Sequence, residues 1–491
     1  MLRRLLATAV LSWLIVLQGC VTTSSIPELP STLGEDGLLV ARLYVPGSAA
    51  WQNASINIDG KLHGANLRDG YIAIALRPGD HNFVQLRVEG LHLSSYQSQE
   101  SDIQKVARGV GVYRPPTYYY SPGSSYTVYY TTLAVNRRFT IEAGKITNLG
   151  LTVYLAVPED PDKKGAEDPI KKGATAGKTK RYNTAILDNS AEMSRYLEVN
   201  YPNLMASVKD RTMKLAPGNY LDAKKLPELR RFIASHEVKG RKFIKTSTLS
   251  AVYGDAGTVV TFKPGADGKI TNLQVLDTGT FADIVDARTD GERFIFLTAE
   301  AKLLVLDQGK LTQVKVPFPV HPSRLASFGN GGVAIVDNRM RILTSRDLGN
   351  NWTNYDGAMI EKPRSDIGLV SHGQGAYVYL GNRGVPSAIL YLSPNESTPR
   401  AINPPEYRGG VSNTSYNTVI VREAGLFIVY NDREFFFRSH AGQKWGLHSK
   451  PGSKCKAMEF DATGLNLKIE CEGTKYESGN SGLIWTKTGG T

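Results

Sequence analysis

The residues of this chain that could do chemistry are its histidines, serines and cysteines, and their spacing decides which reactions they could support. The eight histidines are scattered, and none forms a His-x-x-x-His pair that would hold zinc on one face of a helix. The chain also lacks a Gly-x-x-x-x-Gly-Lys phosphate loop, a Gly-x-Ser-x-Gly serine turn and a dinucleotide-binding glycine pattern. The sequence therefore predicts no metal site and no cofactor, and it supplies no catalytic residues.

Cys20 follows an apolar stretch at residues 5–17 that two arginines precede. That stretch is far shorter than the ~20 residues of a membrane-spanning helix, so it indicates a secretory signal peptide. The sequence Leu17-Gln18-Gly19-Cys20 resembles the lipobox of bacterial lipoproteins, with Gln18 where a smaller residue is usual. The resemblance implies cleavage before Cys20, its acylation by several chains such as palmitate, and anchoring in the cell envelope. Val21 rather than Asp follows, which favours the outer membrane, and an ordinary secretory signal with a chance cysteine is the alternative.

Cys455 and Cys471 lie near the end of the chain, eight residues on either side of Thr463. Residues 456–461 and 465–470 have the composition of two strands around a turn. A symmetric hairpin would place the two cysteines opposite one another. In the oxidising periplasm that an export signal implies, this spacing predicts a structural disulfide.

Tyrosines crowd one segment between residues 113 and 130, together with several prolines and serines. Tyrosine offers a large contact area and a polar tip, which suits a glycan, a membrane interface or a protein partner. An extended hairpin whose aromatic side chains pack across its strands accounts for the same composition equally well. The tyrosines singled out for an interaction are Tyr118, Tyr119, Tyr120, Tyr129 and Tyr130.

The most regular residue spacing in the sequence is a pattern typical of a tight turn, not of a catalytic site. Ser345, Asp347, Gly349 and Trp352 form a Ser-x-Asp-x-Gly-x-x-Trp pattern, which we call a box. A short acceptor at the Asp position can bond the N–H groups of its own turn, and glycine permits the positive φ of a tight reversal. The tryptophan can then wedge its ring against a neighbouring hairpin. Two partial copies contain Gly442 and Trp445, and Ser478, Asn480, Gly482 and Trp485.

The boxes recur at a regular period. With three fainter copies included, the final box positions are 271, 312, 352, 400, 445 and 485, so the spacings are 41, 40, 48, 45 and 40 residues. This is the length of a four-stranded propeller blade, and each box follows a run that would be a third strand. The pattern resembles Asp-box (BNR-repeat) propellers, which include sialidases. The resemblance implies a mainly β protein with a C-terminal six-bladed β-propeller, or seven blades as the alternative.

Changes in composition along the chain predict several segments before the propeller. We expect a lipoprotein signal peptide at residues 1–19, a tether at 20–34, a β-sandwich-like domain at 35–158, a flexible linker at 159–181, a helical connector at 182–240 and the propeller at 241–491. In the first domain, Ile58-Asp59-Gly60-Lys61 and Leu76-Arg77-Pro78-Gly79-Asp80-His81 resemble the PEGA type of small β-sandwich. Such domains generally serve as interaction modules.

Two segments join the predicted domains. The linker holds an eight-residue duplication, at residues 159–166 and 167–174, whose polar composition has no core to bury. Apolar spacing then predicts short helices at residues 190–197 and 227–234. We expect both helices to pack on the first blade of the propeller.

An enzyme of the sialidase type would need a set of catalytic residues that cannot be recognised in this sequence. Such a site uses three arginines for the substrate carboxylate, a tyrosine nucleophile paired with glutamate and an aspartic acid, and it begins with an Arg-Ile-Pro signature. The nearest sequence here is Ser323-Arg324-Leu325-Ala326, in the third expected blade. The formal net charge of +12, or +10 without Arg3 and Arg4, is spread thinly, which favours solvated charge over a dedicated basic tract.

Two functions remain open after these observations. We favour a membrane-anchored lipoprotein of the periplasm or outer membrane whose propeller is a non-catalytic scaffold for a protein or glycan. A divergent sialidase-like glycan hydrolase is the alternative. The compartment argues against nucleic acid as a partner.

Substituting Cys20→Ser should release the protein from the membrane fraction, because serine carries none of the acyl chains that bind at ~0.8 kcal/mol per buried CH₂. The measurement is the partition of the protein between membrane and soluble fractions after lysis. Ser24→Ala is the control and should stay with the membranes. A Cys20→Ser protein that also stays there would show that another segment holds it.

Overall fold

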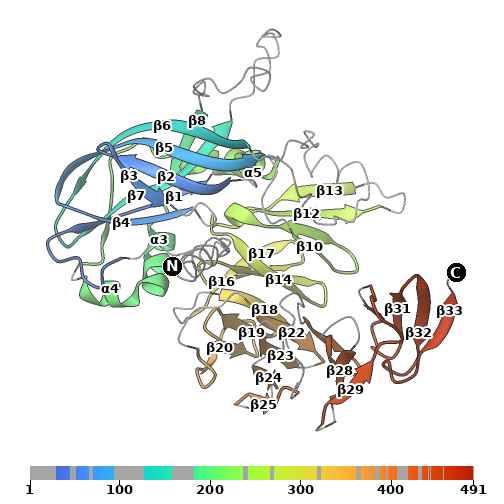
Figure 1. Cartoon of the computed structure of the whole chain (residues 1–491). Helices are drawn as coiled ribbons and strands as arrows, with labels where there is room; N and C mark the ends of the chain where they lie inside the picture. The colour runs from blue at the N-terminus through green and yellow to red at the C-terminus, as the bar shows by residue number, and fades with distance from the viewer. Residues whose placement is uncertain are drawn as a thin grey trace, which may run out of the picture. The chain divides into compact units, whose positions relative to one another are not determined.

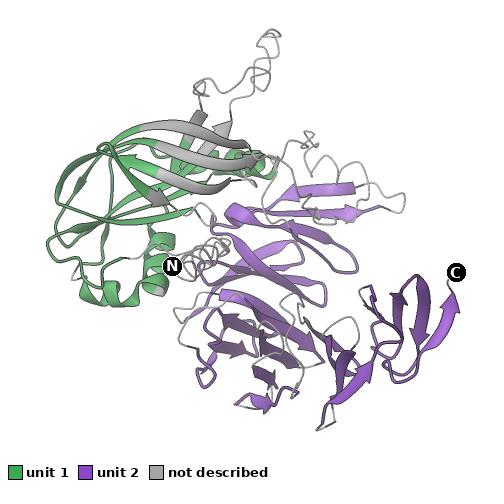
Figure 2. Ribbon diagram, in the orientation of Figure 1, with its two compact units in different colours: residues 1–239 green, residues 240–491 purple. Residues whose placement is uncertain are grey.

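The structure is a computed structural model. It describes residues 29–44, 51–65, 70–92, 127–156, 182–208, 210–235, 242–265, 270–317, 322–360, 366–373, 375–381, 388–393, 396, 398–405, 418–429, 434–440, 442, 444–456 and 458–489. The chain forms two compact units, residues 1–239 and 240–491 (Figure 2). None of the helices in the described residues is both long and apolar enough to cross a membrane.

The part of the first unit that the structure describes contains two β-sheets (Figure 1). One has the order β4-β1-β7-β8, with β9 also paired to β7, and consists of β1 (Gly37–Tyr44), β4 (Tyr71–Leu76), β7 (Ile146–Ala156), β8 (Tyr182–Leu187) and β9 (Met213–Leu215). The other has the order β3-β2-β5-β6 and consists of β2 (Trp51–Ile58), β3 (Lys61–Ala65), β5 (Gly79–His92) and β6 (Thr127–Ile141). Pairing is antiparallel except that β7 runs parallel to both β1 and β9.

Alternation along β1 explains how the first unit is layered. Leu39 and Leu43 point to one face, where they pack with Ile56 and Phe83 of the second sheet. The next residues along the strand point the other way, because successive side chains of a strand alternate between faces. Leu38 and its neighbours on that face pack against the helices α3 (Ser190–Asn200) and α4 (Pro202–Ser207). The unit is therefore a two-sheet sandwich with a helical layer outside one sheet.

The helical connector predicted at residues 182–240 is wrong as a separate part. Its first segment is β8, a strand of the first sheet, and α3 lies on that sheet rather than on the propeller as we expected. The remaining elements before residue 240 are η2 (Ala223–Lys225) and α5 (Leu226–Ser235). Sequence periodicity located α3 and α5, but it gave no sign of which sheet α3 would cover.

A buried ion pair fixes α3 to the first sheet. Arg42 of β1 donates to Glu192 of α3 at 2.6 Å, and Tyr71 of β4 donates its hydroxyl to the same carboxylate oxygen at 2.5 Å. Arg42 and Glu192 are only 2% and 5% exposed. Charges taken out of water must be paired and hydrogen-bonded, so the loss of either partner would leave an unpaired buried charge between α3 and the sheet.

The described residues of the second unit form six antiparallel sheets of four consecutive strands each, which we number in chain order. The first three contain β10 (Lys242–Lys245), β11 (Ser250–Tyr253), β12 (Val259–Pro264) and β13 (Ile270–Val275); β14 (Ile284–Asp290), β15 (Arg293–Thr298), β16 (Lys302–Asp307) and β17 (Lys310–Lys315); β18 (Pro322–Gly329), β19 (Gly332–Asp337), β20 (Ile342–Ser345) and β21 (Thr353–Tyr355). One short helix, η3 (Asp255–Gly257), lies in the first.

The last three sheets repeat this plan. They contain β22 (Ile367–His372), β23 (Gly375–Leu380), β24 (Ala388–Leu392) and β25 (Arg400–Ile402); β26 (Thr418–Arg422), β27 (Gly425–Val429), β28 (Glu434–Ser439) and β29 (Gly446–Ser449); β30 (Glu459–Phe460), β31 (Leu467–Cys471), β32 (Thr474–Ser478) and β33 (Thr486–Gly489). This succession of four-stranded antiparallel sheets is a β-propeller fold, as expected from the box period. The number of blades stays a prediction.

The core of the second unit lies between successive sheets. In β19, Val333 and Ile335 pack toward the second sheet, while Ala334 and Val336 pack toward the fourth. Both faces of the strand are buried, which explains why its sequence is continuously apolar rather than alternating. Similar clusters join the first sheet to the second, the fourth to the fifth and the fifth to the sixth.

Candidate functional site

The box of the third sheet closes the turn between β20 and β21 with its own side chains. Ser345 Oγ accepts the N–H of Gly349 at 2.8 Å. Asp347 Oδ1 accepts from the hydroxyl of Ser345 at 2.8 Å and from the N–H of Asn351 at 2.8 Å. Gly349 has a φ of 93°, which glycine adopts without strain. These contacts satisfy backbone groups of the turn, and the structural role of the box stays a prediction.

The box of the sixth sheet forms the same bonds, although Asn480 stands at the aspartate position. Ser478 Oγ accepts the N–H of Gly482 at 2.9 Å. Asn480 Oδ1 accepts from Ser478 Oγ and from the N–H of Ile484, both at 2.9 Å. A carbonyl oxygen therefore replaces the carboxylate as acceptor, and the turn does not require a negative charge.

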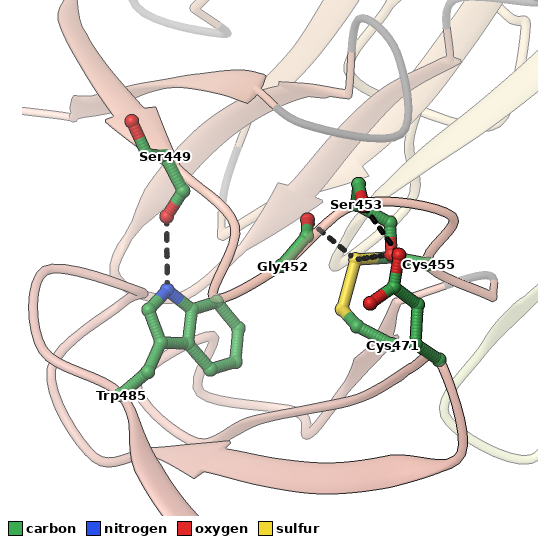
Figure 3. Close-up of a disulfide and its surroundings, with 7 residues drawn as sticks. Ser449, Gly452, Ser453, Cys455, Cys471 and Trp485 are labelled. Atoms are coloured by element: carbon green, nitrogen blue, oxygen red, sulfur yellow. Dashed lines mark hydrogen bonds between the residues drawn. A yellow bond between two sulfur atoms is a disulfide. The ribbon is translucent and has the colours of Figure 1, made fainter.

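The box tryptophans each contact the preceding sheet. Trp485 donates its indole N–H to the carbonyl of Ser449 at 3.1 Å (Figure 3), and Trp445 donates to Asn403 at 2.8 Å. Trp352 packs in the apolar cluster between the second and third sheets instead. In these three sheets the indole thus links the box hairpin to the preceding sheet.

Strand direction separates the boxes from the opposite edge of the sheets. In an antiparallel succession of four strands, the first and third run the same way. Each box follows a third strand, so it lies at the edge where the first strands end. The beginnings of the first strands lie at the other edge, where no box occurs.

That other edge carries a group of charged residues from three successive sheets, which we call the basic cluster: Lys242, Asp286, Arg288 and Arg324. Lys242 of β10 donates to the carbonyl of Val285 in β14 at 2.6 Å. Asp286 accepts a hydrogen bond from the Arg288 guanidinium at 2.8 Å. It also accepts the backbone N–H of Leu325 at 2.9 Å, and Leu325 follows Arg324 in β18. One buried carboxylate therefore ties the second sheet to the third and pairs with one of the three cations, Arg288.

The charges of the basic cluster act on one another. Partial loss of water lowers the pKa of Lys242, Asp286 opposes this effect, and Arg324 and Arg288 add to it. Arg324 donates only to the carbonyl of Ser323 among the described contacts, and no described carboxylate pairs with it. With three cations and one anion, the cluster has a formal charge of +2.

The three cations of the basic cluster are suited to contact an anion. Tyr253 lies beside it, and burial together with the negative charge of Asp286 raises the pKa of Tyr253 to about 12. A tyrosine nucleophile needs the opposite shift, toward easier loss of its proton. The described residues also contain no group of three or more His, Cys, Asp and Glu that could hold a metal ion.

Sequence reasoning found only part of this cluster. Arg324 stands out in the sequence only as part of the nearest match to a sialidase signature. Lys242 and Arg288 carry no motif, and they meet Arg324 only because three first strands lie side by side. Their signal in the sequence is a cation within the first strand of successive repeats, which becomes visible once the blades are aligned.

The other predicted site residues are placed as follows. Cys20, Tyr118, Tyr119 and Tyr120 lie outside the described residues. Tyr129 and Tyr130 belong to β6, where they pair with Gly90 and Glu89 of β5 in a long antiparallel hairpin. The roles proposed for all of these residues remain predictions.

Cys455 and Cys471 form a disulfide in the sixth sheet (Figure 3). Cys471 ends β31 and is 2% exposed, and Cys455 pairs with it just before β30. The four strands of this sheet come from one continuous segment, and among the described residues no strand from elsewhere joins it. The disulfide is therefore a covalent cross-link within the sixth sheet.

No protein-family model matches the chain, and no curated protein matches it. Among solved structures, the chain is similar to YCF48 bound to D1 peptide, at 15% identity over 50% of this chain and 85% of that chain, with a TM-score of 0.34. It is similar to YCF48 from Cyanidioschyzon merolae at 12% identity, over 50% and 83%, with a TM-score of 0.34. The β-propeller domain of Myceliophteria thermophila Cps50 (Swd1) follows at 12%, over 51% and 86%, with a TM-score of 0.32. Likeness at this level says nothing of function.

Asp347→Ala should lower the melting temperature without abolishing partner binding, because Asp347 bonds only its own turn. These hydrogen bonds, first of all that from the Asn351 N–H, hold the pKa of Asp347 below its ordinary value. Its contribution is therefore complete above the unfolded pKa and is lost as the pH falls through the folded pKa. Thermal unfolding of both proteins should converge in acid.

Asp307→Ala is the matched control for this prediction. Asp307 is exposed at the end of β16, just before the Gly309 turn. No described bond to its side chain closes that turn, so the variant should melt like the wild type. Loss of partner binding in a folded Asp347→Ala protein would place the box in the functional site.

Reduction of Cys455–Cys471 should destabilise the sixth sheet first. The disulfide spans 16 residues, for which the chain-entropy model gives about 3 kcal/mol. Hydrogen exchange should rise at residues 456–485, while amides of the first unit serve as the internal reference. An equal rise of hydrogen exchange in both units on reduction would contradict a stabilising role of the disulfide in the sixth sheet. Two free thiols in protein exported to the periplasm would contradict it as well.

Proposed function

We propose that the protein is a lipid-anchored component of the bacterial envelope whose propeller binds an anionic partner, a protein or a glycan, without transforming it. Acyl chains on Cys20 would hold it to the membrane, with the outer membrane as the favoured site. The basic cluster would be the contact that recognises the partner.

The observation that carries this proposal is the placement of Lys242, Arg288 and Arg324 around a single carboxylate. Arg324 has no carboxylate partner in the described residues, and Lys242 donates to a backbone carbonyl, so two of the three positive charges are uncompensated by ion pairs. Arginine presents a planar set of donors that suits carboxylate, sulfate and phosphate groups. A surface of this kind attracts acidic groups and is sensitive to salt.

A hydrolase would need a proton acceptor or nucleophile next to these cations. The carboxylate present, Asp286, is buried and is occupied by Arg288 and the N–H of Leu325. The raised pKa of Tyr253 disfavours ionisation of its hydroxyl at neutral pH. These features support the binding scaffold over the alternative enzyme.

The test compares Lys242→Gln/Arg324→Gln with Lys310→Gln/Lys315→Gln as bait in pull-downs from detergent-solubilised membranes. The control removes the same number of charges from β17, where both lysines are exposed. We expect at least about tenfold less specific partner on the first variant and no change on the control. Added salt should weaken wild-type capture.

Folding of both variants is checked first by thermal unfolding. Equal capture by the wild type and a folded Lys242→Gln/Arg324→Gln protein would contradict the basic cluster as the contact. Release of sugar from a sialylated glycan by the wild type, lost in Arg288→Gln, would favour the hydrolase instead.

A further inference from the structure

The box of the fifth sheet departs from the others at the two positions that cap the turn. In the third and sixth sheets these positions hold a serine and a short acceptor, and both bond within their own hairpin. In the fifth sheet they hold Arg438 and His440, while Gly442 and Trp445 are kept. Neither long side chain resembles a turn cap, so the two positions can serve the interface with the fourth sheet.

His440 does reach the fourth sheet. Its Nδ1 lies 2.7 Å from the hydroxyl of Tyr377, and its Nε2 lies 2.6 Å from the carbonyl of Arg422. A carbonyl can only accept, so Nε2 carries the proton and Nδ1 accepts from the Tyr377 hydroxyl. The ring of His372, at the end of β22, stacks on His440 with the centroids 3.6 Å apart.

Two arginines complete this group. Tyr377, Tyr391 and Arg400 lie side by side across the fourth sheet, since each pairs with the next in register. The Arg400 guanidinium lies 5.4 Å from the centre of the Tyr391 ring. Arg438 belongs to the facing sheet, and its charge acts on both Tyr377 and His440. We call these six residues the interface cluster: His372, Tyr377, Tyr391, Arg400, Arg438 and His440.

The two arginines of the interface cluster have no ion-pair partner among the described residues, and the carboxylate of Glu423 acts on His372 instead. Nε and Nη1 of Arg438 are buried and have no hydrogen-bond partner in the described part of the chain. Neither Arg438 nor Arg400 forms an ion pair with a described carboxylate. Burial first, and then the nearby charge of Arg400, lower the pKa of Arg438. Two guanidinium groups at one interface repel each other, and a buried donor without a partner is unfavourable.

We propose that the interface cluster is a binding site for a small oxyanion, namely a phosphate, sulfate or carboxylate group. Such a group would bridge Arg400 and Arg438 and accept from a tyrosine hydroxyl, which supplies the missing counter-charge. Arg400 lies exposed on the outermost strand, so the anion reaches the cluster from that side. His372 and His440 lie at the box edge of the sheets, whereas the basic cluster lies at the opposite edge, so this site is separate from the proposed partner contact.

The test measures thermal unfolding of the full chain in detergent, in sodium phosphate against sodium chloride of equal ionic strength. Phosphate also stabilises proteins by exclusion from their surface, so the informative quantity is the difference between wild type and Arg438→Gln. With phosphate about tenfold above its Kd, we expect the wild-type melting temperature to rise about 3 °C more than that of the variant. Arg346→Gln removes an exposed arginine from the intact box of the third sheet and should respond like the wild type.

Histidine titration gives a second readout that a purely structural arginine would not change. Burial lowers the pKa of both His372 and His440. A bound anion favours the charged imidazolium, so phosphate should raise both pKa values in the wild type and in Arg346→Gln but not in Arg438→Gln. The Cε1–H signals of ¹³C-labelled histidine report the titration by NMR.

Repeating the measurements with acetate in place of phosphate identifies the class of anion that binds. A shift in melting temperature with acetate indicates a site for a carboxylate, whereas a shift with phosphate alone indicates a site for a tetrahedral oxyanion. Arg400→Gln replaces Arg438→Gln if the latter does not fold, since Arg400 is exposed. Equal phosphate responses of wild type and a folded Arg438→Gln or Arg400→Gln protein, in melting and in histidine titration, would overturn the proposal.

Discussion

The packing of one sheet on the next is the interaction on which the second unit depends. Each interior sheet buries both faces, and the strand Val333-Ala334-Ile335-Val336 shows how this is achieved, with alternate residues joining two different apolar clusters. A four-stranded sheet by itself would leave both of these apolar faces in water. The sheets therefore stabilise each other along the chain.

That constraint explains why the edges carry the specific features of the protein. The box hairpins fasten one edge, through bonds internal to the turn and through indoles that reach the preceding sheet. Because Trp445 keeps this contact in the fifth sheet, the capping positions of that box tolerate Arg438 and His440. At the other edge, Asp286 joins two sheets through a backbone N–H and gathers cations around itself. The contacts that close turns and the contacts proposed to bind a partner therefore both lie at these edges.

The first unit follows the same physical rule with different elements. Its central sheet also has two buried faces, covered by a second sheet on one side and by α3 and α4 on the other. The ion pair of Arg42 and Glu192 is a polar contact inside this core, and it joins α3 to β1. A segment far along the sequence thereby becomes part of the sandwich that the earlier strands begin.

The sequence by itself determined the repeat. Box spacing and apolar runs depend on neighbouring residues, so local pattern alone located the third-strand turns, the class of fold and the pairing of Cys455 with Cys471. Only the tertiary structure decided what depends on distant segments. It assigned β8 and α3 to the first sheet, and it brought Lys242, Arg288 and Arg324 together from separate repeats, as well as Arg400 and Arg438. Charged side chains carry no periodic signal in the sequence. Which of them come into contact depends on how the sheets pack, and the packed sheets come from segments tens of residues apart.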